Sequence, residues 1–134
     1  MKKVLLALSV ITSFILTSCQ KENVNPGNTT ATPVVKDILV EYRVYSESGN
    51  VQVEMEIPAN HNTVMLKTIV EVNRNDYSYE FFWKSNTHFS VSSWNTNGLN
   101  KDITVEIYVD GILFKSATRN HSTGIASASG TFVE

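Results

Sequence analysis

The sequence has few of the groups that disulfide-stabilised or thiol-dependent proteins use. It contains a single cysteine, Cys19, in 134 residues, so the chain by itself cannot form a disulfide or a CxxC metal site. Its longest apolar run, residues 4–16, is shorter than the roughly 20 residues that a membrane-spanning helix needs. After that run, no segment has a convincing apolar stripe with the 3.6-residue period of an amphipathic helix. These absences make the position of the one cysteine informative.

The cysteine lies at the end of a recognisable N-terminal pattern. A basic start, Lys2 and Lys3, precedes the short apolar run, an order that is typical of a secretory signal peptide. The run ends in Leu16, Thr17, Ser18 and Cys19. These four residues resemble the lipobox of bacterial lipoproteins, in which the cysteine thiol is diacylated and the peptide before it is removed. The resemblance implies a signal peptide over residues 1–18 and a lipid anchor on Cys19.

Removal of this peptide changes the charge of the chain. The full sequence has 11 basic and 13 acidic residues, a net charge of −2. Without Lys2 and Lys3, nine basic residues remain against thirteen acidic ones, which gives −4. We therefore expect no nucleic-acid partner, because nucleic-acid binding calls for a basic patch. Gln20 replaces the aspartate that retains many Gram-negative lipoproteins in the inner membrane, so we expect an outer-membrane location, facing the periplasm or the exterior.

A change in pattern divides the remainder into two parts. Residues 19–36 are rich in Asn, Thr and Pro with little periodicity, which predicts a flexible tether. After them, apolar and polar residues alternate with period two, which is typical of half-buried strands. We expect strands over about 38–45, 51–57, 63–72, 77–84, 88–94, 103–109 and 112–117, and a last one within 124–133. Asp110-Gly111 predicts a two-residue hairpin.

The spacing of these segments predicts the fold class. Seven or eight strands with a turn every 8 to 12 residues favour one all-β domain over residues 37–134. We expect an antiparallel β-sandwich of immunoglobulin-like type. A closed barrel is the alternative, because alternation along a strand does not distinguish open sheets from closed ones.

Three segments of this domain resemble a known family. They are YRVYSESGNVQVEMEIP, FSVSSWNTNG and ITVEIYVDGILFKSATRNHSTGIASASG, which span about Tyr42 to Gly130. Their order, and above all the VEIYVDG hairpin before a terminal strand of small residues, is similar to the MmpS-like transport accessory family. The resemblance implies a membrane-attached β-sandwich that associates with a large lipid-exporting transporter.

The sequence offers no catalytic constellation. The three histidines, His61, His88 and His121, lack the close spacing of zinc ligands, and no serine lies in a GxSxG elbow. Glu54 and Glu56 point to the same side of one strand, but a solvated sheet face accounts for them. We therefore expect no enzymatic activity, no metal and no cofactor.

Aromatic residues are concentrated between positions 77 and 94. Most of them are expected in the core, because large aromatic side chains are usually well buried. Phe82 must point away from Trp83 in a regular strand, and Trp94 shares its side with His88, Ser90 and Ser92. Phe82 and Trp94 are therefore the candidates for exposed rings that stack on a glycan or anchor a protein partner.

These observations favour a lipid-anchored, non-enzymatic binding or accessory protein of the bacterial envelope. One alternative is an MmpS-like transport accessory subunit with a membrane transporter as partner. A second alternative is a surface lipoprotein that binds glycans or host proteins. The glycan alternative requires that Trp94 is not fully buried.

Overall fold

The computed structural model describes residues 34–59, 64–120 and 124–134, all within one unit of the chain, Thr32–Glu134. The predicted signal peptide, Cys19 and most of the predicted tether lie outside the described residues. Within these ranges, no helix is long and apolar enough to cross a membrane. The described strands are β1 (Asp37–Ser46), β2 (Val51–Pro58), β3 (Met65–Val72), β4 (Asp76–Lys84), β5 (Thr87–Asn95), β6 (Ile103–Val109), β7 (Ile112–Arg119) and β8 (Ala126–Phe132).

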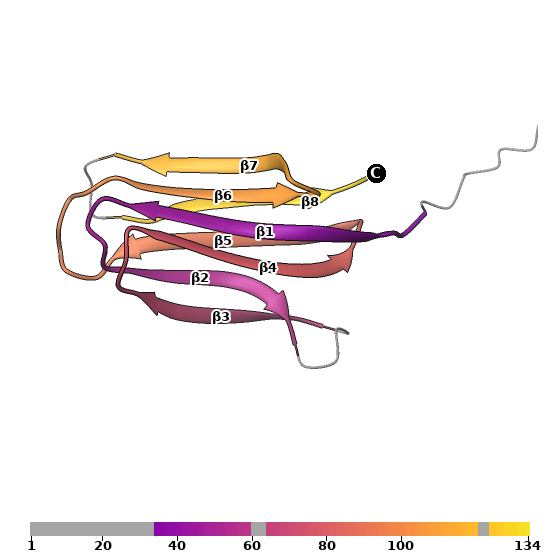
Figure 1. Cartoon of the computed structure of the whole chain (residues 1–134), viewed down its shortest axis with the longest axis horizontal. Helices are drawn as coiled ribbons and strands as arrows, with labels where there is room; N and C mark the ends of the chain where they lie inside the picture. The colour runs from indigo at the N-terminus through magenta and orange to yellow at the C-terminus, as the bar shows by residue number, and fades with distance from the viewer. Residues whose placement is uncertain (1–33, 60–63, 121–123) are drawn as a thin grey trace, which may run out of the picture. The chain divides into compact units, whose positions relative to one another are not determined.

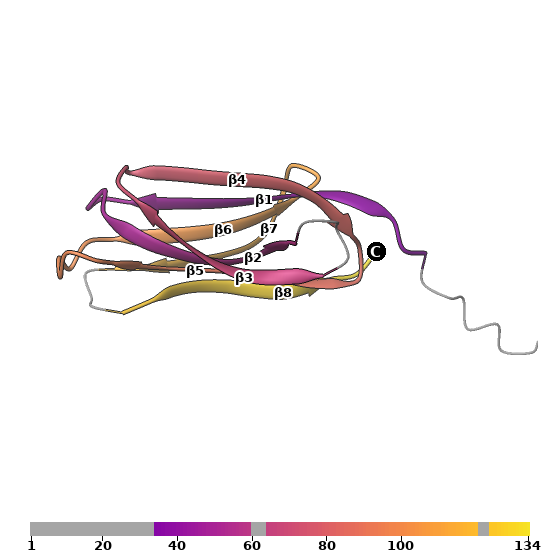
Figure 2. The same ribbon diagram turned by 90° about the horizontal axis from the view of Figure 1, so that it is seen from below.

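The strands form two four-stranded sheets that pack face to face (Figures 1 and 2). One sheet has the order β4-β1-β6-β7, the other has the order β3-β2-β5-β8, and every pairing is antiparallel. The predicted all-β antiparallel sandwich is therefore confirmed. The immunoglobulin-like part of the prediction is not confirmed, since that fold places four strands in the order ABED on three strands CFG.

The core consists of the inward-pointing residues of both sheets. Burial alternates along β1, β2, β5 and β6, because successive side chains of a strand point to opposite faces. The fully buried large side chains are Ile38, Val40, Tyr42, Val44, Val51, Val53, Met55, Phe89, Val91, Ile103, Val105 and Ile107. Both sheets contribute to this cluster, so the two sheets stabilise each other by burying a common apolar interior.

Tyr42 connects the two sheets. Its side chain extends from β1 into the interior, where no part of it is exposed, and its hydroxyl donates a hydrogen bond of 2.8 Å to the carbonyl of Glu56 in β2. Its ring meets Phe81 edge to face at 5.4 Å between centroids, and Phe81 in turn lies 6.4 Å from Phe89 of the other sheet. The buried phenol thus has a hydrogen-bond acceptor inside an aromatic cluster.

The Asp110-Gly111 hairpin between β6 and β7 is as predicted. Asp110 has φ 49° and Gly111 has φ 77°, the positive values that a type I′ turn requires at both central positions. The Asp110 carboxylate also accepts a hydrogen bond of 2.8 Å from the Leu39 amide of β1, and the Asp110 amide donates one to the Leu39 carbonyl. The hairpin is therefore fixed to the beginning of β1.

Small residues in β8 permit a close approach of β7. A Cβ atom placed on Gly130 would lie 2.8 Å from the Lys115 side chain and 3.2 Å from the Phe114 ring. Phe114 and Phe132 meet edge to face at 5.5 Å across the same contact. β8 is an edge strand of its sheet, and its small residues make room for these side chains of β7.

The beginning of β3 is not buried in the way that its sequence alternation predicts. The alternation places Leu66 on the same side as Val70 and Val72, which pack in or against the core. Leu66 is nevertheless exposed. Met65, the first residue of β3, packs against the core instead, so the alternation does not hold at the beginning of this edge strand.

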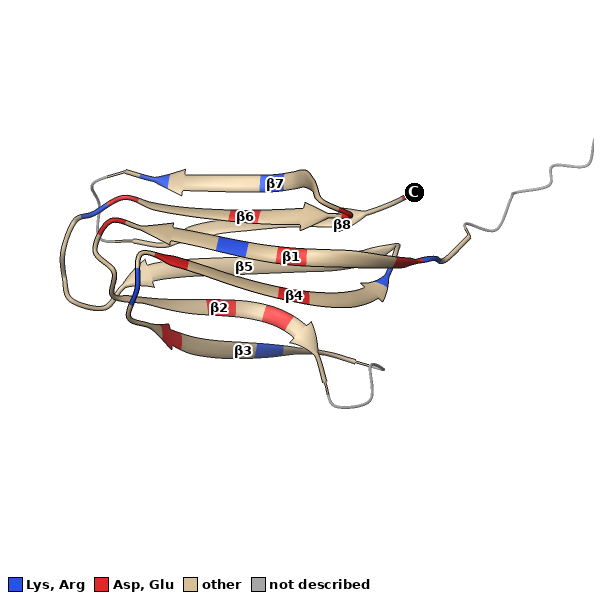
Figure 3. Cartoon of the chain, in the orientation of Figure 1, with Lys and Arg blue, Asp and Glu red and all other residues tan. Residues whose placement is uncertain are grey.

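The strand directions define two ends of the sandwich. Odd-numbered strands begin, and even-numbered strands end, at the end where the described chain starts (Figure 1). We call this the proximal end. The opposite end, which carries the loops that follow β1, β3, β5 and β7, is the distal end. Acidic and basic residues are interspersed along the strands between the two ends (Figure 3).

A pair of phenylalanine substitutions tests the assignment of inner and outer faces. Phe89 is fully buried, so Phe89→Ala should lower the free energy of unfolding by about 3–5 kcal/mol through lost burial and cavity formation. Phe82 is 68% exposed, so Phe82→Ala should change the free energy of unfolding by no more than about 0.5 kcal/mol. Urea denaturation of both variants measures the difference. Equal losses would contradict the described packing.

Tyr42 predicts a loss of stability at alkaline pH. Burial, followed by the nearby Glu56 carboxylate, raises the pKa of the Tyr42 phenol far above its ordinary value. The unfolded chain loses this proton above about pH 10 while the folded protein keeps it, so stability falls as pH rises, by up to about 1.4 kcal/mol per pH unit. Tyr42→Phe should lose about 1 kcal/mol at neutral pH with the hydrogen bond to Glu56, yet show a shallower decline above pH 10.

Urea denaturation at a series of pH values from 7 to about 11 makes the comparison. Burial is also the first cause of the raised pKa of Tyr77 and Tyr108, so some alkaline decline should remain in the variant. Identical slopes in the two proteins would show that Tyr42 does not titrate as a buried phenol.

Candidate binding surfaces

The two aromatic candidates lie on opposite sides of the sandwich. Phe82 is on the outer face of β4, an edge strand of the β4-β1-β6-β7 sheet. Trp94 is on the outer face of β5, a central strand of the other sheet. Phe82 is exposed and Trp94 is half-buried, so neither ring is fully buried in the core. One flat ligand cannot contact both rings, and they represent two separate candidate surfaces.

Trp94 lies at the end of a stripe of hydroxyl groups on β5 and β8. In the register of these strands, His88 faces Thr131, Ser90 faces Ser129, and Ser92 faces Ser127. The Ser92 and Ser127 hydroxyls are hydrogen-bonded at 2.8 Å, and His88 Nδ1 lies 3.4 Å from the Thr131 hydroxyl. On its other side, Trp94 faces Gln52 of β2. This face therefore offers one accessible indole beside short hydroxyl side chains, a composition suited to contact with sugars.

Phe82 borders a shallow depression at the proximal end. The depression, of about 340 Å³, is lined by Asp37, Phe82, Trp83 and Lys84. Lys84 and Asp37 form an ion pair of 2.6 Å across it, and Phe82 faces Leu39 of β1. Trp83 points inward and packs against the core, as its alternation with Phe82 predicts. The exposed ring of Phe82 therefore lies beside the Lys84–Asp37 ion pair and is not enclosed in a pocket.

A polar cluster around Arg43 occupies the centre of the same outer face. The Arg43 guanidinium donates to both carboxylate oxygens of Glu41, at 2.6 and 2.9 Å, and lies 4.2 Å from the centroid of the Tyr108 ring. The Tyr108 hydroxyl donates to Glu106 at 3.1 Å. Partial desolvation, followed by this hydrogen bond, raises the pKa of Tyr108. The guanidinium thus contacts both a carboxylate and the face of a tyrosine ring, which gives this surface a fixed, charge-bearing group.

A depression of about 290 Å³ extends from this cluster toward the distal end. It is lined by Glu41, Arg43, Tyr45, Arg74, Asp76, Tyr77 and Ser78. Arg74 lies 5.5 Å from the centroid of the Tyr77 ring at its margin. Two arginines, two carboxylates and two tyrosines thus share one open basin.

Sequence reasoning did not single out this basin or the Arg43 cluster. The available signal was that Glu41, Arg43 and Tyr45 alternate with apolar residues along β1 and must share the outer face. Tyr108 occupies an equivalent outward position on β6. What was missing was the pairing of β1 with β6, which brings Tyr108 opposite Glu41. That pairing is not encoded in either strand alone.

The buried hydroxyl groups of the described residues have structural partners. Ser93 donates to the carbonyl of Gln52 at 3.0 Å, and Ser85 accepts a hydrogen bond of 3.0 Å from the Lys36 amide. Glu54 forms an ion pair of 2.7 Å with Lys67 on a sheet face that is only partly covered. In the ranges that the structure describes, no three His, Cys, Asp or Glu side chains gather as metal ligands would. The expected lack of catalytic and metal chemistry stays a prediction.

Some predicted residues lie outside the described ranges. They are His61, His121 and the lipobox-like residues Leu16, Thr17, Ser18 and Cys19. Their proposed roles remain predictions from the sequence.

Comparison with known proteins gives no assignment. The chain matches no protein-family model and no curated protein. The similarity of residues 42–130 to the MmpS-like family therefore stays a prediction, and the faces described above carry the functional argument.

Proposed function

We propose that this chain is a lipid-anchored, non-enzymatic binding or accessory protein of the bacterial envelope. The observation that carries the proposal is the order of the N-terminal elements: a basic start, the apolar run of residues 4–16, and the lipobox-like residues ending at Cys19. A short polar segment then leads to β1, which begins at Asp37. Anchor, tether and compact β domain together present protein surfaces at a membrane.

The described surfaces are consistent with binding rather than turnover. The Arg43 cluster borders an open basin, and the Trp94 face lies on the opposite sheet. Their polar groups already have partners within the protein, such as Glu41 for Arg43 and Ser127 for Ser92. A rigid and internally satisfied surface costs little conformational entropy when it binds. The partner under this proposal is an envelope protein. In its more specific form, the chain is an MmpS-like accessory subunit and the partner is a membrane transporter.

The anchor is tested by substitution of the cysteine. Cys19→Ala removes the only thiol and should abolish incorporation of radiolabelled palmitate, with the protein leaving the membrane fraction. Ser18→Ala is the matched control, since it keeps a small residue before the cysteine and should be processed as the wild type is. Undiminished labelling of the Cys19→Ala variant would contradict the assignment of the anchor.

The partner is sought by cross-linking in intact cells, followed by affinity purification and mass spectrometry. We expect a membrane-embedded or outer-membrane protein to be enriched with the wild type and lost with Cys19→Ala. If no protein is enriched above the Cys19→Ala control, the accessory form of the proposal fails.

Glycan binding is a second candidate, and the accessibility of Trp94 favours it. Trp94 is half-buried beside the Ser92–Ser127 hydroxyl pair, so part of its indole face is available for stacking. Trp94→Ala should then weaken binding to a recognised polysaccharide by about tenfold or more. Phe82→Ala, on the opposite sheet, should leave that affinity unchanged. Affinity electrophoresis or calorimetry against a polysaccharide panel measures both, and equal effects of the two variants would exclude a Trp94 site.

A further inference from the structure

The exposed apolar side chains of the domain are concentrated at its proximal end. Among the described residues, eight of the twelve exposed large hydrophobic side chains lie there: Val34, Val35, Val64, Leu66, Phe82, Ile112, Leu113 and Val133. The most exposed are Val34 at 79%, Ile112 at 74% and Phe82 at 68%. Scattered apolar residues are normal on a protein surface, but a concentration at one end marks an interaction site.

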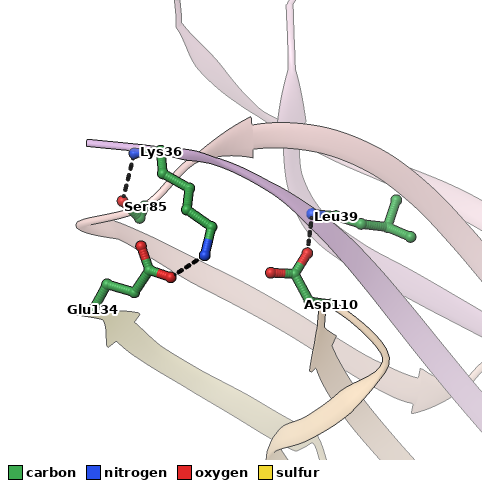
Figure 4. A network of polar contacts seen from close by, with 5 residues as sticks. All are labelled: Lys36, Leu39, Ser85, Asp110 and Glu134. Atoms are coloured by element: carbon green, nitrogen blue, oxygen red, sulfur yellow. Dashed lines mark hydrogen bonds and ion pairs between the residues drawn. The ribbon is translucent and has the colours of Figure 1, made fainter. Parts of the chain in front are cut away.

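The chain leaves the domain at this same end, in a fixed position. The Lys36 amide donates to the Ser85 hydroxyl at 3.0 Å, and the Ser85 amide donates to the Lys36 carbonyl at 2.8 Å. The Lys36 ammonium pairs with Glu134, and Asp110 holds the Leu39 amide nearby, so four segments of the chain are joined there (Figure 4). Residues 34–36 therefore start from a defined point beside the apolar side chains.

The distance from that point to the predicted anchor is short. Val34 follows Cys19 by fifteen positions in the sequence. A flexible chain of that length has an end-to-end distance of about 20–25 Å. The ten-residue strand β1 extends about 33 Å from the proximal toward the distal end. Under the proposed lipid anchor, this average span is shorter than β1, so the proximal end would lie nearer than the distal end to the bilayer.

We propose that the apolar proximal end docks on the surface of the phospholipid bilayer, with Phe82, Ile112, Leu113 and Val133 entering its interface. This inference rests on the proposed lipid anchor, which supplies the high local concentration that weak docking needs. The Asp110-Gly111 hairpin places Ile112 and Leu113, both exposed, at the beginning of β7. The bilayer is the occupant because the chain that leads to the predicted anchor starts among these side chains.

The charges at this end are paired with one another, so burial of apolar side chains is the driving force for docking. Lys84 pairs with Asp37 at 2.6 Å, Lys36 pairs with Glu134, and the Asp110 carboxylate is engaged by a backbone amide. Among the described residues of this end, Lys36 and Lys84 are thus matched by neighbouring carboxylates and give no basic patch for anionic lipids. Docking should therefore occur on zwitterionic phosphatidylcholine vesicles and change little with salt or with added anionic lipid.

The test attaches the domain to vesicles without using Cys19. A hexahistidine tag replaces residues 1–19 and binds nickel-chelating lipid in phosphatidylcholine vesicles, which leaves an introduced cysteine as the only thiol. Ile112→Cys at the proximal end and Ile125→Cys at the distal end each carry an environment-sensitive fluorophore. These positions are matched, because both native side chains are exposed isoleucines, at 74% and 55%. Lipid-borne bromine quenches a fluorophore that enters the bilayer.

We expect blue-shifted and bromine-quenched emission from position 112 and neither change from position 125. In the Ile112→Cys background, Phe82→Ser should reduce the ratio of docked to free domain by about tenfold, while Leu99→Ser at the distal end should not. Equal signals from 112 and 125 would overturn the proposal. So would a blue shift that appears without vesicles at high protein concentration, which would indicate a second copy as the occupant.

The experiments distinguish a failure of the docking proposal from a failure of the proposed lipid anchor. A failure of docking on nickel lipid leaves palmitate incorporation at Cys19 untouched. Loss of the anchor assignment, in turn, would appear only in the labelling of Cys19 and would not alter quenching in the tagged protein.

Discussion

The structure depends on the burial of one face of each sheet against the other. Val53, Val91, Val105 and Tyr42 occupy this interior, and their inward direction sets the outward direction of every residue between them. The opposed sheets of a sandwich lie about 10 Å apart, so side chains on the two outer faces cannot meet. Trp94 and Phe82 are separated for this reason, and the domain has independent surfaces instead of a single cleft.

Strands were predictable because period-two alternation is a local property. The inward side of Tyr77, Tyr79, Phe81 and Trp83 and the turn at Asp110-Gly111 follow from adjacent residues alone, and both are observed. The order of strands within the sheets was not predictable, since pairing joins segments that are distant in sequence. Arg43 stacks on Tyr108 only because β1 pairs with β6. The gathering of Ile112, Phe82 and Val133 at one end likewise depends on strand directions and hairpin positions in the folded domain.

The two ends of the sandwich suit different tasks under the proposed function. The proximal end holds the start of the described chain and most of the exposed apolar side chains. The basin that includes Arg43, Tyr45 and Asp76 extends toward the distal end. A protein attached through Cys19 would then present this basin away from the lipid, where an envelope partner can reach it. Under the proposed function, the arrangement orients the basin toward that partner.

Mass spectrometry of the N-terminal peptide of the chain, purified from bacterial membranes, tests the central claim most directly. The account predicts that the mature protein begins at Cys19 and that this residue carries a thioether-linked diacylglycerol. A chain that begins at Met1, or one that is cleaved elsewhere and keeps an unmodified Cys19 thiol, would contradict it.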